Sequence, residues 1–217
     1  MGIEMNKTIN ISSLESIATK AMGCSDCFEQ HAVKHAYIEK AQPRFVGKDY
    51  WNSKSRVAFV MLNPGAGSAC ERDQNWNLTL QGFMAGAIDL HEVFDCQRRH
   101  MPHWGRGKLV RFIQAHGLDL EEIAIVNIAW CSTLGNQYPK AMLSHCFEKH
   151  TLAWIKELDP NKVILSGTNT HGFSDVIQRS IPKVEIYPGY HYAHRPNTAA
   201  RANERVADIR SQLKIST

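Results

Sequence analysis

Four short runs rich in apolar residues are the feature that most limits how this chain can fold. They lie at residues 57–62, 123–128, 162–166 and 183–187. Each run has the length of a buried strand, and the segments between them show the apolar spacing of helices. Strands that alternate with helices form a mainly parallel sheet covered on both faces. We therefore predict an α/β fold.

The intervening segments predict helices over residues 12–22, 77–93, 107–116, 141–158, 169–180 and 198–213. The first of these helices is indicated by a capping-box pattern, Ser-Ser-Leu-Glu. A chain of 217 residues that is 43% hydrophobic and 21% charged can bury a sizeable core, and this composition excludes a disordered chain. We expect one domain over residues 1–217, in which residues 1–40 form a helical segment.

The apolar runs are too short for a membrane protein. None approaches the ~20 residues that a membrane-spanning helix needs. Residues 1–10 also lack the apolar stretch of a secretory signal. We expect a monomer in the cytoplasm, with no membrane partner.

The cysteines form two groups that are far apart in the sequence. Cys24 and Cys27 make a CxxC pair, and Cys131 and Cys146 flank a loop that contains proline. In a reducing compartment such thiols are metal ligands or catalytic groups more often than disulfides. Two cysteines at this spacing can hold one metal ion or one corner of a cluster. The spacing leaves zinc and an iron–sulfur cluster both open, and the alternative is that each cysteine is a small core residue.

Polar and glycine-rich segments follow the predicted strands. They begin at Asn63, Asn127, Gly167 and Tyr190. The carboxyl ends of parallel strands meet at one edge of a sheet, and ligands bind there. We therefore expect the functional site at this edge.

Five motifs occur in a characteristic order. They are the CxxC pair, Asn-Pro-Gly at 63–65, Asn-Ile-Ala-Trp-Cys at 127–131, Pro-x-Lys-Val-Ile-x-x-Gly at 160–167, and a histidine-rich loop at 190–196. This order resembles the uracil-DNA glycosylase superfamily, most closely its iron–sulfur branch (family 4). The Asn-Pro-Gly motif is similar to that of the mismatch-specific branch.

The resemblance implies a three-layer α/β/α fold with a four-stranded, mainly parallel sheet. It implies hydrolysis of the N-glycosidic bond of a base that is flipped out of DNA. It also implies that Cys24, Cys27, Cys131 and Cys146 hold a 4Fe–4S cluster, with zinc as the alternative.

The resemblance further implies roles for four polar residues. Asn63 would position the attacking water, and Asn127 would bind the Watson–Crick edge of the flipped pyrimidine. His191, or His194 close to it, would donate a hydrogen bond to O2 of the leaving base and so lower the cost of its negative charge. An amide presents a donor and an acceptor together, so Asn127 matches uracil in one orientation and cytosine in the other.

Other residues are expected to support these roles. Trp76 and Phe83 are candidates to stack on the flipped base, although either can instead be a core residue. Gly65 would let the backbone approach the sugar closely. Asp73 is an alternative residue to orient the water.

A basic stretch separates two of the predicted helices. Residues 97–118 contain no acid but several cations and interleaved aromatic residues. Such a stretch is either a solvated face or a surface for phosphates, and its lack of acids favours contact with DNA. The candidate DNA-binding residues are Arg98, Arg99, Arg106 and Lys108, together with Arg195 in the histidine-rich loop.

The expected function is that of a DNA glycosylase acting on uracil or an altered pyrimidine. One alternative is a glycosylase specific for a modified cytosine, such as a glucosylated hydroxymethylcytosine in invading phage DNA. The other is a DNA-binding protein that has lost the chemistry.

Overall fold

A parallel sheet forms the centre of the protein. The computed structural model describes residues 11–193 and 199–213. Its four strands run parallel in the order β2-β1-β3-β4. Their bounds are Val57–Met61 (β1), Ile123–Asn127 (β2), Lys162–Ser166 (β3) and Glu185–Gly189 (β4). Every residue of the first three strands is buried, as their continuous apolar sequence predicts.

The fourth strand begins two residues later than the predicted range of 183–187. It is an edge strand, and its exposed residues alternate with buried ones. Pro188 lies within it, which an edge strand tolerates because its outer backbone groups need no partner. The predicted range was wrong because the apolar residues of this strand do not mark its ends.

Helices account for most of the remaining chain. Their bounds are Ile11–Met22 (α1), Asp26–Gln30 (α2), Glu71–Met84 (α3), Leu90–His100 (α4), Lys108–Ala115 (α5), Lys140–Cys146 (α6), Leu152–Leu158 (α7), Thr168–His171 (α8), Ser174–Ser180 (α9) and Ala199–Leu213 (α10). A π-helical turn, Phe147–Thr151, joins α6 to α7, and a 3-10 segment, Met101–Gly107, joins α4 to α5. None of the helices in residues 11–193 and 199–213 is long and apolar enough to cross a membrane.

Two predicted helices are interrupted in the structure. The range 77–93 is wrong as a single helix because α3 ends at Met84 and α4 starts from a capping box made by Asp89 and Glu92. The range 169–180 divides into α8 and α9. The structure confirms four predicted helices, with ends that differ by at most one residue: those over 12–22, 107–116, 141–158 and 198–213.

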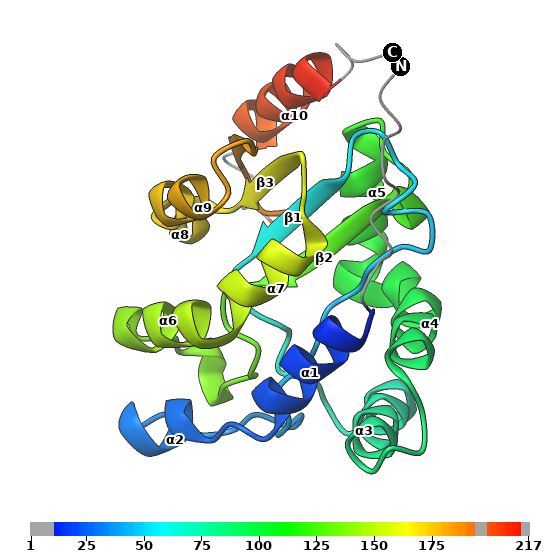
Figure 1. The fold of residues 1–217 in the computed structure, drawn as a ribbon, viewed down its shortest axis with the longest axis vertical. Helices are drawn as coiled ribbons and strands as arrows, with labels where there is room; N and C mark the ends of the chain where they lie inside the picture. The colour runs from blue at the N-terminus through cyan, green and yellow to red at the C-terminus, as the bar shows by residue number, and fades with distance from the viewer. Residues whose placement is uncertain (1–10, 194–198, 214–217) are drawn as a thin grey trace.

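The helices cover both faces of the sheet and so confirm the three-layer α/β/α arrangement. Helices α1 and α7 contact each other on one face, in front of the strands in Figure 1. On the other face Phe59 of β1 packs against Phe112 of α5, with 5.7 Å between the ring centroids. Helix α10 contacts both α5 and β4. Paired strand residues in a parallel sheet point to the same face, so Phe59 and Met61 share the α5 face with Ile125 and Asn127.

Candidate functional site

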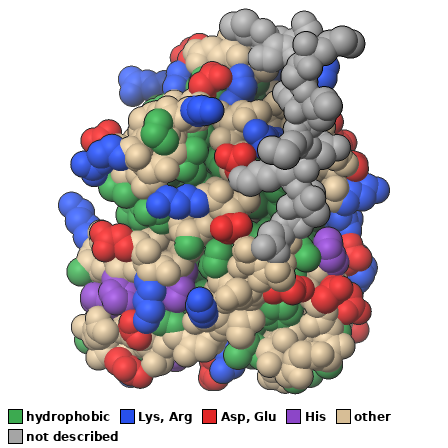
Figure 2. All heavy atoms as spheres, in the orientation of Figure 1, with side chains coloured by type: hydrophobic (Ala, Val, Ile, Leu, Met, Phe, Trp, Pro, Cys, Tyr) green, Lys and Arg blue, Asp and Glu red, His purple; other side chains and the backbone are tan. Residues whose placement is uncertain are grey.

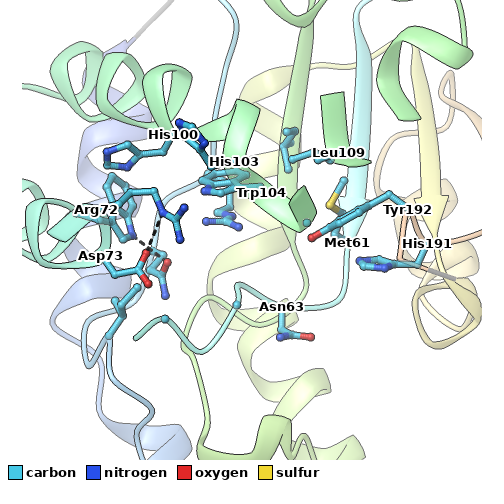
Figure 3. A pocket seen from close by; sticks show the side chains of 18 residues that line it. Met61, Asn63, Arg72, Asp73, His100, His103, Trp104, Leu109, His191 and Tyr192 are labelled. Atoms are coloured by element: carbon cyan, nitrogen blue, oxygen red, sulfur yellow. Dashed lines mark hydrogen bonds and ion pairs between the residues drawn. The ribbon is translucent and has the colours of Figure 1, made fainter. Parts of the chain in front are cut away.

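A cavity of about 200 Å³ opens at the carboxyl end of β1. Met61, Ile125 and Leu109 form its apolar side. Figure 3 shows His191 and Tyr192 on one side of it and Arg72 and Asp73 on the opposite side. A second cavity of about 380 Å³ lies beside the first. Asn63 and His191 line both cavities and therefore stand at their junction.

Asn127 is the last residue of β2, and only 1% of its surface is exposed. It lies in register with Met61, so its side chain points to the face on which the first cavity opens. Neither Nδ2 nor Oδ1 of Asn127 has a hydrogen-bond partner among the described residues. An amide buried in this way costs about 1–3 kcal/mol per unsatisfied group, so a fold that keeps it needs a compensating ligand or function.

Asn63 lies two residues after the end of β1, and hydrogen bonds from its amide group hold the side chain in place. Its Nδ2 donates to the Pro64 carbonyl at 2.7 Å and to Oδ1 of Asn136 at 2.8 Å. These two bonds use both amide protons and fix the orientation of the side chain. Oδ1 of Asn63 is thereby left as an acceptor at the junction of the two cavities.

His191 is the second residue after β4. Its Nδ1 accepts a hydrogen bond from the backbone N–H of Ala193 at 3.1 Å. In the neutral ring the proton therefore lies on Nε2, which makes that atom a donor. The ring leans on Tyr192, with 4.2 Å between centroids. His194, the alternative histidine, lies outside the described residues, as does Arg195.

Tyr192 depends on a glycine for its position. A Cβ atom at Gly105 would lie 2.5 Å from Cε2 of Tyr192, and Gly105 has a φ of 57°. Both the close approach and the left-handed backbone require glycine. The segment after β4 is thus docked on the turn between α4 and α5, and together they close one side of the cavity.

The predicted stacking residues fall in different places. Trp76 lines the first cavity, and its Nε1 donates to Oε1 of Gln42 at 2.9 Å. Gly65 also lines this cavity, and a Cβ atom there would meet open space. Phe83 does not reach the cavity. It lies in the core beside a separate depression formed with Glu15 and its neighbours, so its expected role in base stacking is wrong for this cavity.

Asp73 faces the cavity from α3 as a negative charge. Its Oδ2 accepts from the backbone N–H of Ser68 at 2.8 Å and from the Ser68 hydroxyl at 3.0 Å. Burial alone would raise the pKa of Asp73, but hydrogen bonds from Cys70 and Ser68 and the charge of Arg72 outweigh it and lower the pKa. Asp73 is already bonded to these groups and is less free than Asn63 to hold a water.

Arg44 is a cavity residue that no pattern in the sequence singles out. Its guanidinium carbon lies 4.5 Å from the centroid of the Trp104 ring, and both residues line the first cavity. It occurs in a polar loop segment without periodicity, where an arginine is ordinarily a surface residue. In the structure its neighbours Pro43 and Phe45 are both buried, which the sequence does not reveal.

The basic stretch is divided between paired and exposed cations. Arg98 is neutralised because it forms ion pairs with Asp95 and with Glu121, the latter at 2.6 Å. Arg99, Arg106 and Lys108 are exposed, and no carboxylate in the described part of the chain forms an ion pair with them. The structure therefore leaves these three as candidate phosphate contacts and argues against Arg98.

The four predicted cysteine ligands lie together although they are distant in sequence. The thiols of Cys27 on α2 and Cys146 at the end of α6 interact, which lowers the pKa of Cys27 and raises that of Cys146. Burial, and then the charges of Cys27 and Cys24, raise the pKa of Cys131 to about 12. All six cysteines of the chain are free thiols.

The cysteine group has the side chains that a metal centre needs, but they are not arranged around a common point. No three His, Cys, Asp or Glu side chains among the described residues are arranged to hold a metal ion. Four thiols that influence one another's ionisation are nevertheless the donor set of a zinc or iron–sulfur site. Lys149 and His145 both contact Asp26, the residue before Cys27, His145 at 2.9 Å. Figure 2 shows histidines gathered on the same face of the molecule.

No protein-family model and no curated protein matches the sequence. The assignment of a function therefore depends on the chemistry of the site itself.

Proposed function

We propose that the protein is a DNA glycosylase that hydrolyses the N-glycosidic bond of a flipped-out uracil or altered pyrimidine and leaves an abasic site. The observation that carries the proposal is the amide of Asn127, which is buried, has no hydrogen-bond partner among the described residues and lies on the face of the sheet where the cavity opens, although it does not itself line the cavity. An amide that gains its hydrogen bonds only when a ligand arrives is suited to bind the donor–acceptor edge of a pyrimidine.

Asn63 supports the same proposal from the other side of the reacting bond. Cleavage of a glycosidic bond passes through an oxocarbenium-like sugar, which a weakly activated water can attack. Oδ1 of Asn63 can accept a hydrogen bond from that water because Nδ2 is already engaged. A strongly basic side chain is not needed if the nucleobase has largely departed before the water attacks.

His191 would assist departure of the base. A neutral imidazole with its proton on Nε2 can donate to O2 of the pyrimidine as negative charge collects there. The charge is stabilised without a transfer of the proton. Trp76, which is fixed by Gln42, would offer its ring to the base within the cavity.

The four-cysteine group is proposed to hold a 4Fe–4S cluster, with zinc as the alternative. Cys24, Cys27, Cys131 and Cys146 would be its ligands. Bound there, the cluster would tie helix α2 to the end of α6 and to the segment after β2. Free thiols of this kind are suited to a reducing compartment such as the cytoplasm.

A second candidate substrate is a cytosine that carries a polar substituent. The cavity of about 380 Å³ adjoins the first at Asn63 and His191 and is lined by Ser166, Thr168 and Asn169. The hydroxyl of Ser166 is buried and has no hydrogen-bond partner among the described residues. It could bind a substituent that extends from the base, while the amide of Asn127, turned over, matches cytosine.

The test is incubation with duplexes that contain uracil, a thymine mismatch or a hypermodified cytosine, followed by alkaline cleavage at abasic sites. We expect strand cleavage for one class of base, and loss of discrimination between bases in Asn127→Ala. Binding of every duplex without cleavage of any would identify a DNA-binding protein and refute the proposed chemistry.

A further inference from the structure

Arg44 is a partly buried cation whose Nε atom is shielded from solvent. No carboxylate among the described residues forms an ion pair with its guanidinium, and its Nε is buried without a hydrogen-bond partner. Burial lowers the pKa of Arg44 to about 10, and the ionisable groups that act on it are the phenols of Tyr192 and Tyr138 rather than any carboxylate. The side chain therefore keeps its charge at neutral pH in a place where that charge is costly.

The surroundings of Arg44 leave the cavity with an excess of positive charge. Asp73 is the only carboxylate among the described residues that line the cavity, and it is bound to Ser68 and to Arg72 at 3.4 Å. His100 also lines the cavity but carries no negative charge. Its pKa is lowered mainly by burial and then by the charges of Arg72 and Arg99. A ligand that enters this cavity meets a guanidinium whose charge nothing else has neutralised.

The Trp104 ring limits the positions that Arg44 can adopt. The guanidinium lies over the ring, and such stacking is favourable for arginine in particular because its cationic group is planar. A cation held in place before the reaction stabilises developing negative charge without the cost of reorganisation. In a site that excludes water, this effect is larger than at the surface.

We infer that Arg44 is a catalytic residue of the proposed reaction and stabilises the anionic base as it leaves. The inference rests on the proposed function. The C1′–N1 bond breaks, its electron pair passes to the base, and the resulting anion lies against the guanidinium. The water oxygen bonds to C1′, and the proton released from that water returns through solvent to the base, which leaves neutral. Asn127 would recognise the base, and Arg44 would lower the energy of its charged form.

The test compares leaving groups of nearly equal size. Single-turnover release of uracil and of 5-fluorouracil from the same duplex would be measured for the wild type, Arg44→Gln and Arg44→Lys. We expect Arg44→Gln to slow uracil release by about 10²-fold, as loss of a preorganised donor does. Release of 5-fluorouracil should slow by only about tenfold, because its anion needs less stabilisation. Arg44→Lys should recover part of the rate, and the exposed Arg179→Gln should act as the wild type.

A binding measurement separates this role from a general loss of structure. Trp76 and Trp104 line the cavity, so tryptophan fluorescence reports its occupancy. The planar anion of 5-nitrouracil should quench this fluorescence in the wild type and in Arg179→Gln, and much less in Arg44→Gln. Thermal unfolding of the same variants shows whether Arg44→Gln is folded. If it is not, the comparison uses Arg44→Lys, which keeps the charge.

The two proposals fail in different ways. If the wild type releases no base from any duplex, the proposed function and the catalytic role of Arg44 are both overturned. If the wild type releases uracil and Arg44→Gln does so at the same rate, only the inference about Arg44 is overturned. Equal slowing of uracil and 5-fluorouracil would also overturn it, since Arg44 would then not sense the charge on the base.

Discussion

Replacement of Asn127 by leucine should make the protein more stable while it destroys the site. The two side chains have nearly the same shape, and leucine has no polar atoms. Asn127 is 1% exposed, and both polar atoms of its amide lack partners among the described residues. Removal of one unsatisfied buried group recovers about 1–3 kcal/mol, so a gain of about 2 kcal/mol in the free energy of unfolding is expected. For a chain of this size, that gain corresponds to a rise in Tm of about 4–8 °C.

The assay is urea and thermal unfolding, followed by circular dichroism. Asn161→Leu is the matched control, because Oδ1 of Asn161 accepts from Arg56 at 2.8 Å and its Nδ2 donates to the Lys54 carbonyl at 2.9 Å. That substitution removes satisfied bonds and should lower the free energy of unfolding by roughly 1–2 kcal/mol. If Asn127→Leu is as destabilising as Asn161→Leu, the amide is already paired, for example with an ordered water, and the reasoning from an unsatisfied group is refuted.

Three further outcomes are expected. Cys131→Ser should remove iron and the broad absorbance near ~400 nm from the purified protein, and stoichiometric zinc without iron in the wild type would contradict the proposed cluster. Alanine at Arg106 and Lys108 should weaken binding to all DNA sequences and reduce the salt slope by about one unit per contact, whereas alanine at Arg98 should leave the slope unchanged because its charge is already paired. Asn63→Ala should slow single-turnover cleavage by about 10²-fold and leave DNA binding nearly intact, and full activity would show that the water is held elsewhere.

The sequence predicted the sheet well because three strands are buried along their whole length. A strand between two helical layers is apolar along most of its length, and the runs at 57–62, 123–128 and 162–166 show this. The edge strand Glu185–Gly189 has one covered side, and its ends were misplaced. The break between α3 and α4 was missed although Asp89 and Glu92 form a capping box there, because the apolar spacing continues across the break.

The central residues of the site could be predicted because they lie next to strand ends. Asn63, Asn127 and His191 were selected because parallel strands bring their carboxyl ends together, and the structure places all three at that edge. Arg44 lies in a loop with no strand to mark it, and its charge is unusual only because of what surrounds it. Phe83 has the right residue type in the right region, but the face of α3 on which it lies is turned to the core.

The position of the four cysteines has a consequence for the order of events during synthesis. Cys24 and Cys27 leave the ribosome about a hundred residues before Cys131 and Cys146. The two halves meet where α2 contacts α6 and where residues 34–36 pair with residues 132–134, and α6 follows β2 in the chain. Any metal centre built from these thiols is therefore completed only after β2 and α6 have been synthesised. The first CxxC pair waits as reactive thiols in the nascent chain, so delivery of iron or zinc and folding of the sheet are coupled in time.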